Sequence, residues 1–251
     1  MPAGYARQRE RGAVIVALPA VLPEVVAAVQ AAGTLYDWAA ACPNAQPFTG
    51  RGAAYRVRLG AVDALVRHYH RGGFVARLAR DSYVRAGEPR PLRELRVSVA
   101  VRAAGVPTPE VLAAVVHARG PLYRGDLATR FVTDSSDLAA LTWGSARWSE
   151  PLRAAAWHAA GMLLRRSFAA GVRHADLNLR NILVTREHGP VHALLLDLDR
   201  ARIAVVNDVA RHAMLERFHR SRRKLETAFG VPVDAADLAA FEQGLNGPES
   251  A

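Results

Sequence analysis

Three oxygen-bearing side chains in the second half of the chain stand where phosphate chemistry would need them. Asp176 and Asn181 lie five positions apart in the stretch "HADLNLRNILV", which is too apolar for an ordinary surface loop. Asp197 directly follows the very apolar run "VHALLL". A carboxylate in such a place is costly to desolvate unless a cation or a hydrogen-bond donor meets it. These acids therefore need a partner that the local sequence does not supply.

Two predicted strands bring the three side chains together. The runs "NILVT" and "VHALLL" are separated by a turn at 188–190, and we expect them to pair as a hairpin. That pairing places the loop of Asp176 and Asn181 beside Asp197. Carboxylate and amide oxygens suit Mg²⁺, a hard ion that often binds substrate phosphates, and a remaining acid can accept the proton of a hydroxyl group. Phosphoryl transfer requires this arrangement.

The elements that must position these residues follow from periodicity and turn residues. Before the segment near 131–137 we predict mainly strands: "AVIVAL", a hairpin of "AAYRVRL" and "DALVRHY" around Gly60, and strands over 111–119 and 122–132. Helices are predicted after Pro23 and over 74–85 and 91–105, the last ending at Gly105. After this segment, helices are predicted over 151–170 and, as the last element, over 207–229. The stripe of that last helix is Met214, Phe218, Leu225 and Phe229.

The motif residues resemble a known family. "HADLNLRNIL" is similar to the catalytic-loop pattern H-x-D-L-x-x-x-N of protein-kinase-like enzymes, and "LLLDLD" stands where they have the end of the D-F-G strand. In more detail the chain resembles the bacterial lipopolysaccharide core kinases, above all the 3-deoxy-D-manno-octulosonic acid (Kdo) kinases. That resemblance covers about residues 50–203 and is carried, in order, by "GRGAAYRV", "VRHYHRGG", "RDSYVR", "RELR", "HADLNLRNIL" and "DLDRARI".

The resemblance implies a fold and a reaction. The fold is α+β, a protein-kinase-like two-lobed domain with a small β-rich N-terminal lobe (about 1–132) and a mainly helical C-terminal lobe (about 133–251). The reaction is transfer of the γ-phosphoryl group of ATP, with Mg²⁺, to the 4-hydroxyl of Kdo on a lipid A precursor. Asp176 would be the catalytic base, and Asn181 and Asp197 would bind Mg²⁺. In the alternative interpretation, Asp176 is a turn acid and Asn181 only holds the loop.

The phosphate-binding half departs from the kinase pattern. Gly50 and Gly52 have the spacing of a loop that covers phosphates, but Tyr55 stands where the third glycine is expected. Lys224 is the only lysine, so the strand lysine of kinases is missing. We expect Arg67 to replace it, because a guanidinium can contact two phosphate oxygens, and Glu94 to be its ion-pair partner. Alternatively, Arg67 and Glu94 are ordinary solvated residues.

The net charge of +10 indicates an anionic partner, although a GC-rich genome would also favour arginine. The segment "RHAMLERFHRSRRKLETAF" predicts an amphipathic helix with a cationic face. It fits either a solvated helix or an anionic membrane surface that holds a lipid-linked anionic sugar. We expect no nucleic-acid partner, because no binding module is recognisable.

The remaining composition points to a reducing compartment. Cys42 is the only cysteine, so no intramolecular disulfide can form. Prolines and Glu24 interrupt the apolar N-terminal stretch, which argues against a secretory signal. We therefore expect a peripheral protein on the cytoplasmic side of the inner membrane.

Three other functions remain open at the sequence level. One is a heptose kinase of the lipopolysaccharide core, and the second is an antibiotic or metabolite phosphotransferase, which the basic charge disfavours. The third is a catalytically weak kinase-like binding protein. The missing lysine favours it, whereas the intact Asp176, Asn181 and Asp197 oppose it. The sequence leaves the oligomeric state open.

Overall fold

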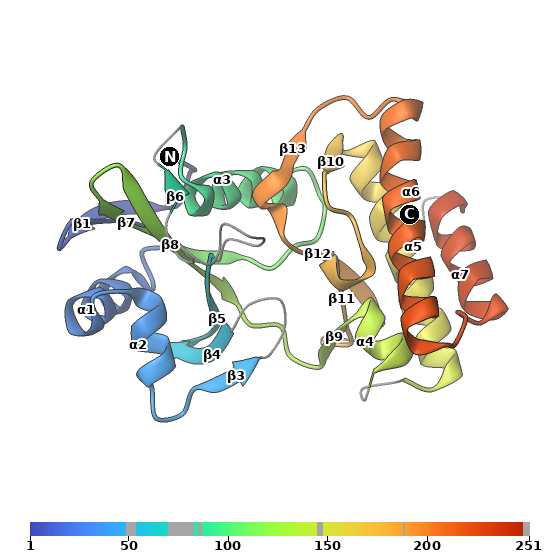
Figure 1. Cartoon of the computed structure of the whole chain (residues 1–251), viewed down its shortest axis with the longest axis horizontal. Coiled ribbons are helices and arrows are strands. Elements are labelled where there is room, and N and C mark those ends of the chain that lie inside the picture. The colour runs from blue at the N-terminus through green and yellow to red at the C-terminus, as the bar shows by residue number, and fades with distance from the viewer. Residues whose placement is uncertain (49–53, 70–82, 85–86, 145–147, 188, 248–251) are drawn as a thin grey trace. The chain divides into compact units, whose positions relative to one another are not determined.

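The computed structural model describes the chain except for residues 49–53, 70–82, 85–86, 145–147, 188 and 248–251 (Figure 1). It divides into two compact units. The first consists of Met1–Val99 and Glu110–Phe131, and the second of Ala100–Pro109 and Val132–Ala251.

The first unit is built on an antiparallel sheet with the strand order β1-β2-β7-β8-β5-β4-β3, and β6 pairs with β8. The strands are β1 (Ala6–Glu10), β2 (Ala13–Ala17), β3 (Gln46–Phe48), β4 (Ala54–Leu59), β5 (Val62–His68), β6 (Tyr83–Val84), β7 (Val111–Arg119) and β8 (Leu122–Arg130). The predicted hairpin around Gly60 is the β4–β5 pair, in which Ala54 lies opposite Arg67. This register fixes the position of Arg67 in the sheet.

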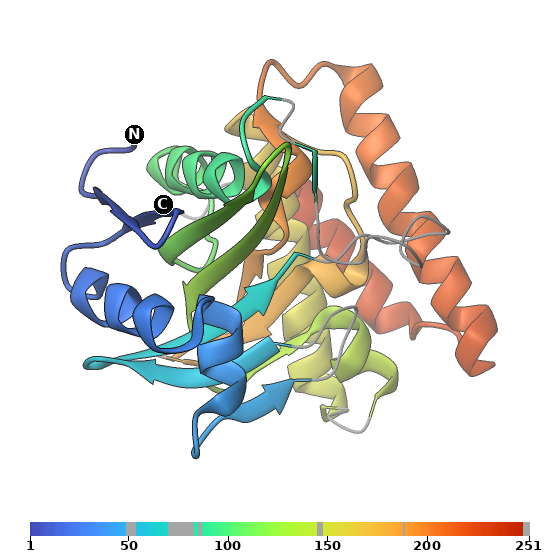
Figure 2. The same cartoon turned by 60° about the vertical axis from the view of Figure 1, so that its left-hand side comes forward.

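Helices cover both faces of this sheet (Figure 2). The helices α1 (Leu22–Ala32) and α2 (Leu35–Ala41) pack on one face, where Ala113 and Val115 of β7 lie in their core. The alternating residues Ala114 and Val116 face the other core, which contains Leu95 of α3 (Arg90–Ala103). Successive strand residues point to opposite faces, so an almost wholly apolar β7 is what a doubly covered strand requires.

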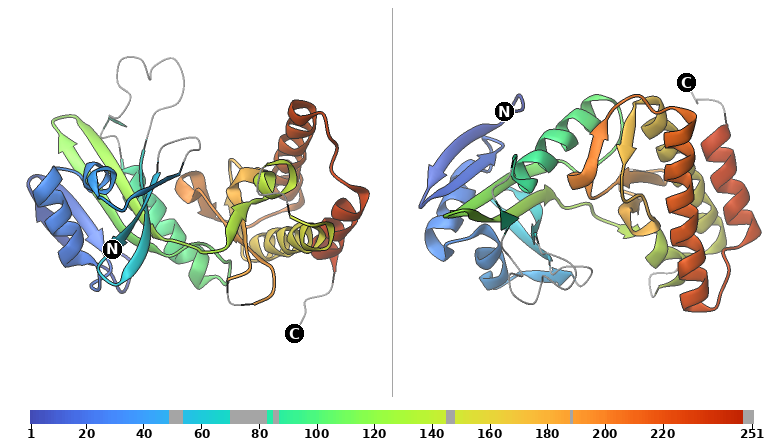
Figure 3. Two further views of the ribbon diagram at one scale, coloured as in Figure 1. Left: turned by 90° about the horizontal axis from the view of Figure 1, so that it is seen from below. Right: turned by 45° about the horizontal axis from the view of Figure 1, so that its top comes forward.

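The second unit is organised around three helices (Figure 3): α5 (Glu150–Ala169), α6 (Asp208–Phe229) and α7 (Ala235–Asn246). Trp157 is fully buried and contacts Phe218 and Phe241 edge-on, and the last two rings stack at 4.8 Å. Gly161 and Gly244 let α5 and α7 approach closely, because a Cβ on either glycine would overlap backbone atoms of the facing helix. The close approach explains glycines in the interior of two helices, where they are otherwise unfavourable.

Short elements complete the second unit and carry its polar loop. They are β9 (Ser135–Asp137), α4 (Leu138–Trp143), β10 (Val172–His174), the 3₁₀ turn η2 (Leu179–Asn181), β11 (Ile182–Thr185), β12 (His192–Leu195), the 3₁₀ turn η3 (Leu198–Arg200) and β13 (Ala201–Ile203). One small sheet has the order β12-β11-β9, and β10 pairs with β13. The predicted β11–β12 hairpin is confirmed.

Three local predictions are wrong. Tyr83 and Val84 form strand β6 instead of the end of a helix, and the rest of 74–85 lies outside the described residues. The helix at 207–229 is followed by α7, which the sequence did not reveal because its apolar face is defined by contact with α5. Phe229 was expected in the buried stripe but is 48% exposed, and it stacks on Trp143 at the end of α6.

Over the residues that the structure describes, no helix has both the length and the apolar composition needed to cross a bilayer.

A buried carboxylate joins three strands of the first unit. Asp126 of β8 has no exposed surface and contacts His68 Nδ1 of β5 at 2.6 Å and His117 Nε2 of β7 at 3.3 Å. It also accepts a hydrogen bond from the Tyr36 backbone N–H at 3.1 Å. Burial acts to raise the pKa of Asp126, but the hydrogen bonds and charges of His117 and His68 outweigh it and lower the pKa.

We expect Asp126→Ala to destabilise the protein by about 3 kcal/mol or more, because both histidines lose a buried acceptor. The lowered pKa means that this contribution is present above the ordinary aspartate pKa of about 4 and is lost as the pH falls through the lower folded-state value. Urea unfolding at several pH values measures it. Glu110→Ala, which removes an exposed partner of Arg130, is the control and should cost less than about 1 kcal/mol. If both variants lowered the free energy of unfolding by the same amount, the stabilising role of the buried Asp126 would be contradicted.

Candidate active site

The loop after β10 is tied to the end of the β11–β12 hairpin by backbone hydrogen bonds. Ile182 lies opposite Leu195 in the hairpin, and the Leu196 N–H donates to the Asn181 carbonyl at 2.9 Å. Asn181 therefore lies beside the residue that immediately precedes Asp197. The proximity of Asn181 to Asp197 was predicted from the same pairing of the two strands.

His174 links the loop to the same strand end. It is 3% exposed, and its Nε2 lies 2.9 Å from the Leu196 carbonyl. A carbonyl can only accept, so Nε2 carries the proton and Nδ1 is the acceptor for the Asp176 N–H at 3.2 Å. The histidine thus fixes the backbone of Asp176 relative to the end of β12.

Two amide side chains converge on the Asp176 backbone. The Nδ2 groups of Asn178 and Asn181 both donate to the Asp176 carbonyl at 2.8 Å. Asn178 also caps η2 by accepting from the Arg180 N–H at 3.0 Å. Sequence reasoning missed Asn178, although an asparagine two positions after an acid is a typical turn signal. These hydrogen bonds hold the loop through its backbone, and Asp176 itself is half-buried.

The Asn181 side chain suits a metal ligand. Its nitrogen is committed to Asp176, which orients the amide oxygen, and in the described part of the chain that oxygen has no hydrogen-bond donor. The residue is 7% exposed, so its orientation is constrained by packing. An oriented amide oxygen is one of the ligand types that bind Mg²⁺ in phosphoryl-transfer enzymes.

Asp197 has an unusual backbone conformation. Its φ of 56° and ψ of 62° lie in the left-handed region, which is uncommon for residues other than glycine and is tolerated by aspartate. The conformation turns the chain from β12 into η3 and leaves Asp197 exposed at the end of a buried strand. Such backbone outliers cluster at functional sites.

The oxygen ligands fit a metal that is shared with a substrate. Among the described residues, no three His, Cys, Asp or Glu side chains are grouped so that they could hold an ion by themselves. Asn181 and Asp197 supply one amide and one carboxylate, and Mg²⁺ is commonly bound by one or two such groups together with waters and phosphates. The residues present therefore suit a metal–nucleotide complex.

The first unit contains the predicted substitute for the kinase lysine. Arg67 of β5 pairs with Glu94 of α3, and its Nη2 lies 2.6 Å from both carboxylate oxygens. Glu94 is 4% exposed and also accepts a hydrogen bond from the Tyr69 hydroxyl, while the Arg67 guanidinium lies 4.8 Å from the centre of the Tyr69 ring. The side chain of Arg67 retains 29% exposure. A buried acid thus holds a partly exposed cation, as predicted.

The remaining predicted nucleotide-binding residues, Gly50 and Gly52, lie outside the described residues. Their assignment to a phosphate-covering loop stays a prediction.

Comparison with known proteins identifies the family. The model of the lipopolysaccharide kinase (Kdo/WaaP) family matches residues 44–243. A 3-deoxy-D-manno-octulosonic acid kinase of Vibrio cholerae is 32% identical over 178 residues, which cover 70% of this chain and 72% of that protein. A protein of the same name from Stenotrophomonas maltophilia strain K279a is 34% identical over 201 residues, or 78% and 76% of the two chains.

A solved structure shows the same fold. It is described as WaaP in complex with acyl carrier protein, and it aligns with a TM-score of 0.52 at 16% identity, covering 86% of this chain and 85% of that one. The α+β, protein-kinase-like fold class is therefore confirmed. The chain belongs to the lipopolysaccharide kinase (Kdo/WaaP) family, and it is a sugar kinase, a phosphotransferase that acts on a hydroxyl group.

Proposed function

We propose that the chain transfers the γ-phosphoryl group of ATP to the 4-hydroxyl of Kdo on a lipid A precursor. The observation that carries this proposal is the loop in which two asparagines and His174 fix the backbone of Asp176, with His174 bonded to Leu196, the residue before Asp197. The names of the relatives from Vibrio cholerae and Stenotrophomonas maltophilia support Kdo as the acceptor sugar.

Each polar residue has one role in this reaction. The carboxylate of Asp176 orients the acceptor hydroxyl and takes its proton as the hydroxyl oxygen bonds to the γ-phosphorus. The bond from the γ-phosphorus to the bridging oxygen of the β-phosphate breaks, and ADP leaves. Asn181 and Asp197 would hold Mg²⁺, which neutralises phosphate charge when bound. Arg67, positioned by Glu94, contacts phosphate oxygens in place of a lysine.

Incubation of the protein with ATP and a purified Kdo–lipid A precursor tests the proposal, with NMR and mass spectrometry of the product. We expect one phosphate on the 4-hydroxyl and little transfer to a heptose-bearing acceptor. Asp176→Asn should lower kcat by about 10²- to 10⁴-fold with unchanged ATP affinity, because only the proton acceptor is removed.

Asp208→Asn is the control for this loss, since Asp208 is an exposed acid in the first turn of α6. Preferred transfer to heptose would favour the heptose kinase instead. ATP binding without transfer to either sugar would favour the catalytically weak binding protein.

The Arg67–Glu94 pair provides a second test. Arg67→Ala should weaken ATP binding by about tenfold or more, since a charge-assisted hydrogen bond to phosphate is lost. Glu94→Gln should also weaken ATP binding, because it releases Arg67 from its ion pair. The control is Arg96→Ala: Arg96 lies on the same helix as Glu94, and its exposed ion pair is with Glu88, which precedes the helix. Unchanged ATP affinity in Arg67→Ala would remove its role as the lysine substitute.

We propose in addition that the protein works at the cytoplasmic face of the inner membrane. The segment from β13 to α6 exposes Ile203, Val205 and Val209, of which Val205 and Val209 are 82% and 77% exposed. Arginines flank these apolar residues in the chain, at Arg200, Arg202 and Arg211. Exposed apolar side chains among cations fit an anionic lipid surface, where each cation contributes about 1 kcal/mol.

Sedimentation with lipid vesicles tests this surface. Binding should be measurable for vesicles that contain phosphatidylglycerol and weak for pure phosphatidylcholine. The triple variant Ile203→Ser, Val205→Ser, Val209→Ser should bind the anionic vesicles at least about tenfold more weakly, because the apolar contact is lost. Val231→Ser, which changes another exposed valine, is the control. Equal binding by all three proteins would refute a membrane role for the segment.

A further inference from the structure

A pocket of about 310 Å³ opens beside the catalytic loop in the second unit. Its lining comes from three parts of the chain: β10 with the residue after it, the η3–β13 segment, and α6. The lining residues are Arg173, His174, Ala175, Arg200, Arg202, Ala210, Ala213, Met214 and Arg217. The volume is in the range of small-molecule sites.

The lining carries four arginines and, within the described residues, no carboxylate. Arg173 of β10 lies directly opposite Arg202 of β13 in the strand register, so the two cations share one face of the pair. Like charges in directly opposed positions destabilise a strand pair. Over the described chain, none of the four arginines forms an ion pair with a protein carboxylate within 4.0 Å. Their repulsion is relieved when an anion binds between them.

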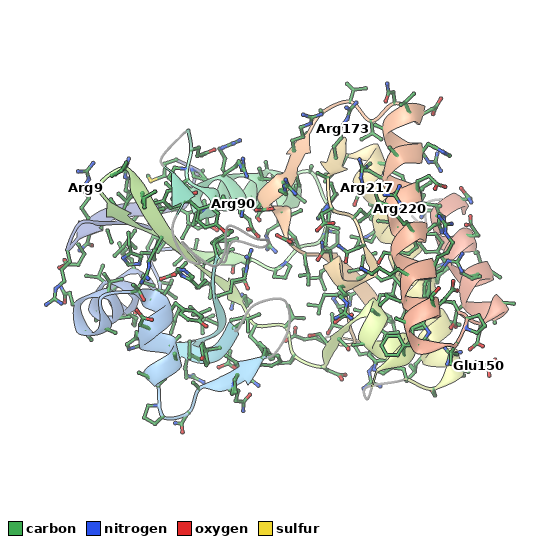
Figure 4. All side chains as sticks on the ribbon, in the orientation of Figure 1. Arg9, Arg90, Glu150, Arg173, Arg217 and Arg220 are labelled. Carbon is green, nitrogen blue, oxygen red and sulfur yellow. The ribbon has the colours of Figure 1, made fainter. Side chains whose placement is uncertain are left out.

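Two of the arginines are held by backbone carbonyls. Arg173 donates through Nε to the Val205 carbonyl at 2.9 Å and through Nη2 to the same oxygen. Arg217 donates through Nη1 to the Ala213 carbonyl at 2.9 Å. Figure 4 labels Arg173 on β10 and Arg217 on α6. Guanidinium groups fixed in this way lose less conformational freedom when they bind an oxyanion.

The pocket adjoins the predicted base. His174 and Ala175 line it, and Asp176 is the next residue of the chain. A group bound among the arginines is therefore adjacent to the loop whose carboxylate receives the hydroxyl proton. Such a position suits the acceptor, whose own charge would hold the reacting hydroxyl in place.

We infer that this arginine pocket binds an anionic group of the sugar acceptor, a carboxylate or a phosphate, and thereby orients the hydroxyl toward Asp176. The inference rests on the proposed function, because it assumes an acceptor that carries such a group. It assigns Arg202 and Arg217 as specificity residues, and Arg173 as a third contact that also holds the β13–α6 connection.

The test compares two double variants, each of which removes two positive charges. Arg202→Ala/Arg217→Ala removes two cations of the pocket, whereas Arg220→Ala/Arg223→Ala removes two exposed arginines of α6 that do not line it. The first variant should raise KM for the Kdo–lipid A precursor by about 10- to 100-fold, with KM for ATP changed less than about twofold. The control should change both values less than about threefold. Thermal unfolding checks that the variants are folded.

Binding of simple probes separates this inference from the proposed function. Isothermal titration with a Kdo glycoside, its carboxylate methyl ester and inorganic phosphate requires no turnover. If the methyl ester binds more weakly than the free glycoside, the pocket binds the carboxylate of the sugar. If only inorganic phosphate binds, the pocket binds a phosphate group. In both cases, the probe should no longer bind to the Arg202→Ala/Arg217→Ala variant.

If the wild type is active and the pocket variant keeps its acceptor KM, the inference is overturned while the proposed function stands. If the wild type lacks activity on Kdo but its pocket binds a probe, the function fails and the anion site remains.

Discussion

The hydrogen bonds to the Asp176 peptide are the constraint on which the candidate active site depends. Its carbonyl accepts from Asn178 and Asn181, and its N–H donates to His174. A carboxylate that acts as a base must be held in place without being neutralised. Here all three of these contacts are made to the backbone of Asp176, so they fix the position of the loop. The bond to the Asp176 carbonyl also orients Asn181, so it couples the position of the proposed base to that of the proposed metal ligand.

In the first unit, the side chain of Arg67 is held by other side chains. The strand lysine of kinases is missing, and Glu94 and the Tyr69 ring hold the guanidinium of Arg67, the residue that we propose in its place. A guanidinium is larger than an ammonium and binds two oxygens in one plane. The buried carboxylate of Glu94 restricts the orientation of the guanidinium. The proposed replacement would change the geometry of phosphate binding while preserving the positive charge.

The arginine-rich composition also acquires a structural meaning. Part of the positive charge is distributed over the exposed face of α6, but four arginines converge on one pocket next to Asp176. The exposed valines and Ile203 belong to the connection that follows two of these arginines. Acceptor binding and membrane contact would then involve neighbouring parts of one segment, which is a reasonable arrangement for a sugar that is attached to a lipid.

The sequence by itself determined the strongly periodic elements and the identity of the chemical groups. The β11–β12 hairpin, the helices α3, α5 and α6, and the Arg67–Glu94 pair were all predicted, because local patterns and a kinase-like motif specify them. Helix α7, strand β6 and the role of Asn178 were not, and Phe229 was wrongly placed in the core. The role of Asn178 is local and could have been found from its turn signal. The other features depend on contacts between distant segments, such as Gly161 against Gly244, which no local pattern contains. The arginine pocket shows most clearly what only the tertiary structure decides. Its four arginines are brought together by the pairing of β10 with β13 and by the packing of α6. The charge around a side chain depends on which residues lie near it in space, and the order of residues in the chain does not specify this.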